Sequence, residues 1–192
     1  TVQIQLETEA DGQAILQAVP AQVEAIEARL SRFRPLSELS QFNRKAGQWT
    51  VVSETLFDNL CAAKHGALIT DGLYNPLILP ALLAAGYEPS FEQVGTPVSH
   101  MAQPVSDWRA IGIRRQSREV YVPPGNAVDL GGVAKGWTAE KLANELAAYG
   151  ACMVNIGGDI AARGRPINRN GWQIKVAEPG QERALQEVAL WN

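Results

Sequence analysis

Residues 127–146 read AVDLGGVAKGWTAEKLANEL, and the assignment of the fold works outward from them. An apolar strand end leads through Gly131 and Gly132 into a helix, with Asp129 before the glycines and Lys135 after them. A helix start offers unpaired N–H groups and the positive end of the helix dipole, and glycine lets a ligand approach the backbone. The turn is therefore a candidate phosphate site, to which Lys135 adds a point charge.

Asp129 fits this interpretation poorly, because a carboxylate would repel a bare phosphate. The conflict eases if Asp129 binds a hydroxyl or an amine of the ligand, or if a cation lies beside it. The pattern matches neither of the common phosphate-binding fingerprints. A glycine turn that only packs a helix against a strand stays open as the alternative.

A second glycine pair lies in VNIGGDIAARG, residues 154–164. A buried strand runs into Gly157 and Gly158, and Asp159 projects from the turn. A ligand could approach the backbone closely here; the alternative is a turn in which Asp159 caps itself. Both glycine pairs lie at the ends of one helix-and-strand unit, so they could face one pocket.

Two upstream segments carry polar side chains in loops, where ligands commonly bind. In residues 70–80, TDGLYNPLILP, Tyr74 either stacks on a flat ring of a ligand or packs in the core with its hydroxyl bonded. Asp71 and Asn75 flank it. In residues 31–43, SRFRPLSELSQFN, a serine could instead cap a helix. The polar residues of that segment are Ser37, Glu38, Ser40 and Asn43.

The composition is that of a folded protein with a substantial core, since 46% of the 192 residues are hydrophobic and 19% are charged. A formal charge of −3, without a run of Lys or Arg, argues against nucleic acid as the main partner. The longest apolar stretch, residues 77–87, is too short to span a membrane and contains Pro80. The chain starts directly in a strand-like segment, so no signal peptide is visible.

Cysteines and histidines form no catalytic or metal-binding pattern. Cys61 and Cys152 lie among small apolar residues, which predicts buried thiols; a disulfide stays open if the protein is exported. His65 in a helix and His100 in a proline-rich loop have no companion at metal or triad spacing, so neither is a candidate base.

The first half of the chain predicts mainly helices. Residues 1–7 alternate like a strand, and helical spacing then runs from residue 11 to 34, with a kink or restart at Pro20. Residues 34–48 read as a polar loop. Ser53 is expected to cap a second helix. The apolar residues expected on the inner face of that helix are Leu56, Phe57, Leu60 and Leu68.

The second half predicts mainly strands. A long helix, residues 134–149, is closed by Gly150. We therefore predict an α+β fold in which N-terminal helices precede a mostly antiparallel sheet with one long helix. The segments that read as strands are residues 107–113, 119–122, 151–156, 172–176 and 185–190.

Taken together, four segments resemble the ApbE family of flavin transferases, the FAD:protein FMN transferases. The pair DLGG-x-AKG and VNIGGD, separated by one helix, is the most specific part, and the resemblance covers nearly the whole chain. It implies an ApbE-like α+β fold. Family members use magnesium to cleave FAD, move FMN onto a Thr or Ser hydroxyl of a target protein and release AMP. The other two segments are LSRFRPLSELSQFN and TDGLYNPLILP.

The resemblance also implies roles for single residues. Lys135 would contact FAD and act as a catalytic residue by steadying developing negative charge. Asp129 would contact FAD, and the backbone carbonyl of Gly132 would be a Mg²⁺ ligand. The other residues expected to contact the flavin nucleotide are Leu73, Tyr74, Asn75, Glu38, Asn43 and Asp159.

The chain departs from the family pattern in two places. Where the family usually has Asp and, two residues later, Thr, this chain has Asn75 and Leu77. The family also continues beyond a strand like EVALWN into a segment whose Asp and Thr complete the magnesium site. We therefore expect one ApbE-like domain over residues 1–192 that lacks its C-terminal part. Since Mg²⁺ prefers six oxygen ligands, such a chain alone is expected to bind metal poorly and to show no detectable transfer.

Three functions are compatible with the resemblance: Mg²⁺-dependent FMN transfer, FAD binding without catalysis, and hydrolysis of FAD to FMN and AMP. The two departures favour the second. The expected partners are a flavin nucleotide and an acceptor protein that carries the Thr or Ser. Family analogy implies a periplasmic location or the outer face of the cytoplasmic membrane, with an anchor only through a segment outside this chain.

Overall fold

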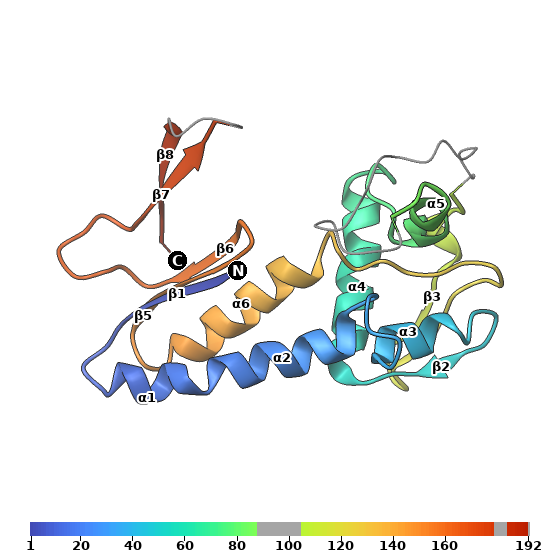
Figure 1. The fold of residues 1–192 in the computed structure, drawn as a ribbon, viewed down its shortest axis with the longest axis horizontal. Coiled ribbons are helices and arrows are strands. Elements are labelled where there is room, and N and C mark those ends of the chain that lie inside the picture. Colours follow the sequence, from blue (N-terminus) through green and yellow to red (C-terminus); the bar gives the residue numbers. More distant parts are fainter. Residues whose placement is uncertain (88–104, 179–183, 192) are drawn as a thin grey trace. The chain divides into compact units, whose positions relative to one another are not determined.

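The computed structural model describes residues 1–87, 105–178 and 184–191 (Figure 1). The chain divides into two compact units, a first unit of Thr1–Val23 with Lys135–Asn192 and a second unit of Glu24–Ala134. Helices and antiparallel strand pairs confirm the α+β class. The single-domain interpretation stays a prediction. His100 lies outside the described residues.

Figure 1 labels many of the elements, which are numbered in the order in which they follow one another along the chain. The helices are α1 Gly12–Gln17, α2 Val19–Leu30, α3 Glu38–Asn43, α4 Glu54–Ile69, α5 Leu79–Ala84 and α6 Ala134–Leu146, with the short 3₁₀ helices η1 Pro76–Ile78 and η3 Trp108–Ala110. The strands are β1 Val2–Glu7, β2 Thr50–Val51, β3 Gly112–Arg114, β4 Glu119–Tyr121, β5 Ala151–Ile156, β6 Asp159–Arg163, β7 Trp172–Ala177 and β8 Ala184–Leu190.

The first unit is built on an antiparallel sheet with the strand order β1-β5-β6. Val2 lies opposite Ile156 and Leu6 opposite Cys152, so the alternation read from residues 1–7 does mark a strand. Helices α1 and α6 lie along this sheet (Figure 1), and Ile15 of α1 packs on the buried cluster that fills the space between them. The buried residues of this cluster are Val19, Ala139, Leu142, Ala143, Leu146, Cys152, Val154 and Ala161.

A two-residue turn joins β5 to β6, because Ile156 pairs with Asp159. Gly157 and Gly158 have φ values of 60° and 100°, the left-handed backbone that such a hairpin turn requires and that glycine adopts freely. Asn155 Oδ1 accepts the N–H of Gly158 at 2.9 Å. The turn was predicted, but strand β6 was not, and the side chain that caps the turn is Asn155 rather than Asp159.

The second unit contains α4 and a second antiparallel sheet with the strand order β2-β4-β3. Ser53 caps α4 as predicted, since its Oγ accepts the N–H of Leu56 at 3.3 Å. Leu68 is 60% exposed, so its predicted place on the inner face is wrong. It lies one residue beyond the buried stripe, which follows the helical period. The buried residues of α4 are Leu56, Phe57, Asn59, Leu60, Ala63 and Ala67, so the inner-face prediction is confirmed for Leu56, Phe57 and Leu60.

Some predicted boundaries need correction. The helix expected over residues 11–34 is two helices, restarted just before Pro20 and ending at Leu30. The expected loop 34–48 contains α3, which Ser37 caps by accepting the N–H of Ser40 at 3.0 Å. In residues 107–113, strand β3 starts only at Gly112, and the long helix ends at Leu146. The described strands form three antiparallel sheets instead of one.

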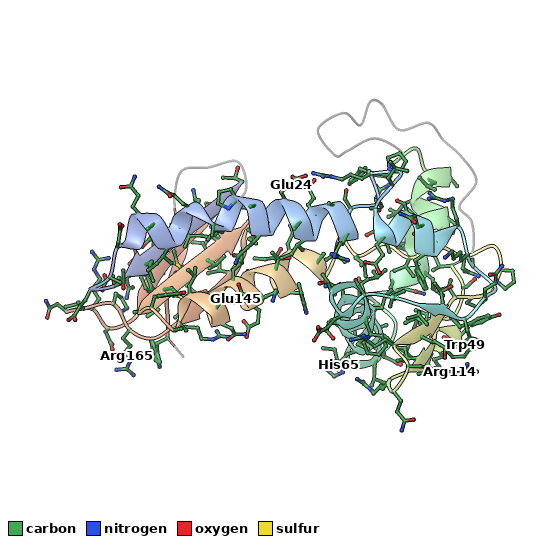
Figure 2. The ribbon with its side chains drawn as sticks, turned by 90° about the horizontal axis from the view of Figure 1, so that it is seen from below. Glu24, Trp49, His65, Arg114, Glu145 and Arg165 are labelled. Carbon is green, nitrogen blue, oxygen red and sulfur yellow. The ribbon has the colours of Figure 1, made fainter. Side chains whose placement is uncertain are left out.

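Both cysteines are free thiols. Cys152 is fully buried and Cys61 half-buried, and burial raises the pKa of both thiols. His65 lies exposed on α4 (Figure 2). None of the helices in the described part of the chain has the length and apolar character needed to cross a bilayer.

Candidate functional site

The turn at residues 129–132 lies in the second unit and is closed by its own acid. Asp129 Oδ1 accepts the N–H of Gly131 at 2.7 Å, and the N–H of Asp129 donates to the carbonyl of Pro76 at 2.9 Å. A Cβ on Gly131 would lie 2.8 Å from Asp129 Oδ1, so only glycine fits without a shift. The carbonyl of Leu130 then accepts the first bonds of α6. These hydrogen bonds give the turn a structural role at the start of α6, in addition to any contact with a ligand.

The Asp129 carboxylate forms an ion pair with the guanidinium of Arg32. The Arg32 Nε lies 2.9 Å from Asp129 Oδ2, and the two side chains are only 13% and 14% exposed. Nη2 of the same guanidinium donates to the carbonyl of Tyr87 at 2.9 Å. Arg32 was not predicted as a site residue, since SRFR contains two arginines and nothing in their spacing shows which one reaches Asp129.

Tyr74 packs against the glycine that is the expected metal ligand. A Cβ on Gly132 would lie 2.7 Å from the Tyr74 ring, and one on Gly66 would lie 3.1 Å from it. The ring therefore packs within the protein, as one alternative predicted. The Tyr74 hydroxyl is buried and has no hydrogen-bond partner among the described residues, so the bonded hydroxyl of that alternative stays a prediction. Burial, and secondarily the charge of Asp129, raises the pKa of Tyr74 to about 12.

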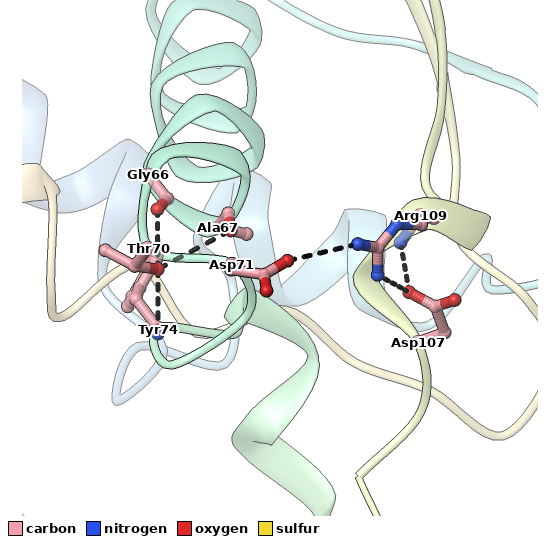
Figure 3. A network of polar contacts seen from close by, with 7 residues as sticks. All are labelled: Gly66, Ala67, Thr70, Asp71, Tyr74, Asp107 and Arg109. Atoms are coloured by element: carbon pink, nitrogen blue, oxygen red, sulfur yellow. Dashed lines mark hydrogen bonds and ion pairs between the residues drawn. The ribbon is translucent and has the colours of Figure 1, made fainter.

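Thr70 fixes the start of the segment that carries Tyr74 (Figure 3). Its Oγ1 donates to the carbonyl of Gly66 at 2.8 Å and accepts the N–H of Tyr74 at 3.0 Å. Asp71 faces away from Tyr74 and lies 3.4 Å from Arg109 in an exposed ion pair. The end of α4 therefore sets where the Tyr74 ring lies.

Asn43 holds the segment that leads into the turn. This segment is not the strand end that the sequence predicted, because β4 already ends at Tyr121. Its Nδ2 donates to the carbonyl of Val128 at 2.9 Å, and its Oδ1 accepts the N–H of Val128 at 2.8 Å. This pair of bonds imitates one step of an antiparallel ladder. Both ends of the Asn43 amide are used, so the structure shows Asn43 placing the residue before Asp129.

Glu38 and Asn75 also have partners within the protein. Glu38 accepts the N–H and Oγ–H of Ser53, at 2.6 and 2.5 Å, and thereby holds the start of α4. Asn75 Oδ1 accepts the N–H of Leu77 and its Nδ2 donates to the carbonyl of Ser106, each at 2.9 Å. A carboxylate could not make the second bond, which gives a physical reason for Asn where the family usually has Asp.

Leu73, by contrast, is 94% exposed at the tip of the turn after α4. Its predicted contact with the flavin nucleotide stays a prediction, as do the contacts predicted for the partnered residues. What the structure establishes is that Asp129, Gly132, Tyr74, Asn75, Asn43 and Glu38 all belong to the second unit.

Lys135 and Asp159 belong to the first unit. Lys135 Nζ lies 3.8 Å from Asp159 Oδ2, and the two side chains are 53% and 46% exposed. An exposed pair of this kind contributes at most about 1 kcal/mol, so a ligand anion can displace the carboxylate at little cost. The single pocket expected for the two glycine pairs joins residues of both units and stays a prediction.

The described residues do not by themselves fit a magnesium site. Among them, no group of three or more His, Cys, Asp or Glu side chains could hold a metal ion. The predicted ligand Gly132 offers a single backbone carbonyl, whereas Mg²⁺ takes six oxygens.

Replacing Asn43 tests its role in holding residue 128. Asn43→Ala leaves the N–H and carbonyl of Val128 without these partners, and it is expected to lower the free energy of unfolding by about 1–3 kcal/mol. Urea unfolding measures this. Gln41→Ala, which removes an exposed bond from the same helix, is the control and should cost less than about 0.5 kcal/mol. Equal losses would contradict the role of Asn43.

The raised pKa of Tyr74 predicts a pH dependence of stability. Because the folded pKa of about 12 exceeds the ordinary value of about 10, folding favours the neutral phenol. This stabilisation is complete below about pH 10 and is lost as the pH rises toward 12. Denaturant unfolding across this range should show a steeper loss for the unmodified protein than for Tyr74→Phe. Exposed Tyr149→Phe is the control, and equal slopes for all three proteins would refute the prediction.

Comparison with known proteins agrees with this architecture. The FAD:protein FMN transferase of Haemophilus influenzae is 27% identical over 188 residues, which are 91% of this chain and 54% of that protein. The one from Vibrio cholerae is 29% identical over 191 residues, 93% of this chain and 55% of that protein. The chain thus spans about half the length of the curated relatives it matches.

Solved structures show the same fold. The ApbE protein of Thermotoga maritima superposes with a TM-score of 0.82 at 21% identity, over 97% of this chain and 62% of that one. The flavin transferase ApbE of Vibrio cholerae gives 0.81 at 22% identity, over 100% of this chain and 65% of that one. The sequence model described as the ApbE family matches residues 1–192. This chain therefore belongs to the ApbE family.

Proposed function

We propose that the protein takes part in Mg²⁺-dependent transfer of FMN from FAD to a Thr or Ser hydroxyl of an acceptor protein, with release of AMP. The observation that carries this proposal is the family match over residues 1–192, with relatives named FAD:protein FMN transferase. Since the chain spans about half of those relatives, the complete reaction is proposed for a full-length protein that contains it.

In this reaction the acceptor hydroxyl oxygen bonds to the FMN phosphorus, and the bond from that phosphorus to the bridging oxygen breaks. The bonding pair leaves with AMP, and the hydroxyl proton passes to a base or to solvent. Such transfers depend mainly on positioning and on neutralising negative charge. The ammonium group of Lys135 is exposed and only weakly paired with Asp159, so it is available to neutralise negative charge on the phosphates.

The second unit would bind the nucleotide through the Asp129–Gly132 turn. Asp129 has one oxygen on Gly131 and the other on Arg32, so its orientation is fixed before a ligand arrives. Mg²⁺ would supply further neutralisation of negative charge if the full-length protein completes its ligands, and the Gly132 carbonyl would then be one of them. By family analogy we propose either a periplasmic location or the outer face of the cytoplasmic membrane.

Incubation of the full-length protein with FAD, Mg²⁺ and an acceptor protein tests the proposal. We expect AMP release and a fluorescent acceptor band in a gel. AMP without a labelled acceptor would identify a hydrolase, and bound FAD without AMP would identify a binding protein; either result would overturn transfer.

Two variants test the placement of the site. Lys135→Ala and Asp129→Ala are each expected to weaken FAD binding about tenfold or more, equivalent to about 1.4 kcal/mol. Lys141→Ala, which removes an exposed lysine paired with Glu145 on the same helix, is the control and should bind normally. Unchanged affinity in both site variants would contradict the placement.

A further inference from the structure

We infer that Arg32 is a positioning residue of the nucleotide site, whose guanidinium neutralises the Asp129 carboxylate so that a phosphate-bearing ligand can approach the turn at residues 129–132. The inference rests on the proposed function, since it requires such a ligand. It also resolves the misfit of an acid at a phosphate-binding turn. The compensating cation belongs to the chain itself.

The guanidinium is held on three sides. Nε faces Asp129 Oδ2 at 2.9 Å, Nη2 donates to the carbonyl of Tyr87 at 2.9 Å, and the Phe33 ring lies 4.1 Å from the guanidinium carbon. Arginine is suited to such a place because its planar group stacks and donates in fixed directions at once. Arg32 therefore keeps one orientation relative to Asp129.

Burial distinguishes this pair from the other arginine ion pairs that the described residues make. Both Arg32 and Asp129 are less than 15% exposed, whereas the exposed fractions are 37% and 61% for Arg34 and Glu24. Removing one partner of a buried pair leaves the other charge uncompensated, where water screens it weakly. Loss of Arg32 would thus leave the negative charge of Asp129 uncompensated at the turn.

The Asp129 carboxylate lies at the turn itself, since its Oδ1 accepts the N–H of Gly131 at 2.7 Å. An uncompensated Asp129 would repel phosphates near Gly131 and Gly132. Arg32→Gln should therefore weaken the binding of anionic ligands through charge, beyond any effect on folding.

The dependence of FAD affinity on salt and on the charge of Asp129 separates a positioning role of Arg32 from a merely structural one. With FAD as the probe, in a full-length protein that contains this chain, Arg32→Gln should weaken binding about tenfold in low salt and by much less in about 0.5 M salt. Because Asp129 is itself a proposed binding residue, the Asp129→Asn single variant is the reference for the double variant. Relative to that reference, Arg32→Gln should cost much less than tenfold, because no charge is left uncompensated. Arg32→Lys should recover part of the loss caused by Arg32→Gln. Arg34→Gln, which removes the exposed pair two residues away, is the matched control and should change affinity less than about twofold.

A second comparison holds even where Arg32→Gln does not fold. In the Asp129→Asn background, loss of Arg32 should change FAD affinity little; a further tenfold loss there would overturn the inference. A loss of affinity on Arg32→Gln that is independent of salt and equally large with and without Asp129→Asn would overturn it as well. If the unmodified protein binds no FAD, the proposed function itself fails. If it binds FAD but the effect of Arg32→Gln depends neither on salt nor on Asp129, only the proposed role of Arg32 fails.

Discussion

The structure of the candidate site depends on the absence of a side chain at Gly131 and Gly132. At the first position a Cβ would meet the Asp129 carboxylate, and at the second it would meet the Tyr74 ring. The turn therefore closes on its own acid and lies against an aromatic ring. This tight closure places the N–H groups and carbonyls of the turn at the start of α6, where we propose that a nucleotide phosphate binds.

Several polar groups around this turn bond to its residues or to the residue before it. Asn43 holds Val128, Pro76 holds the Asp129 backbone, and Arg32 holds its carboxylate. Glu38 acts one step further away by fixing the capping residue of α4. The four sequence segments that resemble the ApbE family are thus linked physically: three of them, including the turn itself, build and brace one feature of the second unit, and the fourth forms the β5–β6 hairpin of the first unit.

Local signals in the sequence predicted the local structure well. The alternation in β1, the Ser53 cap of α4 and the buried strand β5 follow from period and capping, which act over a few residues. What could not be predicted depends on contacts between distant residues. Arg32 reaches Asp129 only after folding, and the Asn43 amide finds Val128 in the same way. Strand β6 was missed because its short, mixed sequence pairs only once the glycine turn brings it beside β5.

The central claim is that the turn at residues 129–132 forms an edge of a flavin-nucleotide site. Hydrogen exchange of its backbone amides, measured with and without FAD and Mg²⁺, tests this directly. The account predicts slower exchange at Gly131, Gly132 and Val133 when FAD is present, and unchanged exchange in the β3–β4 hairpin of the same unit. Equal exchange in the turn at a saturating FAD concentration would contradict the account.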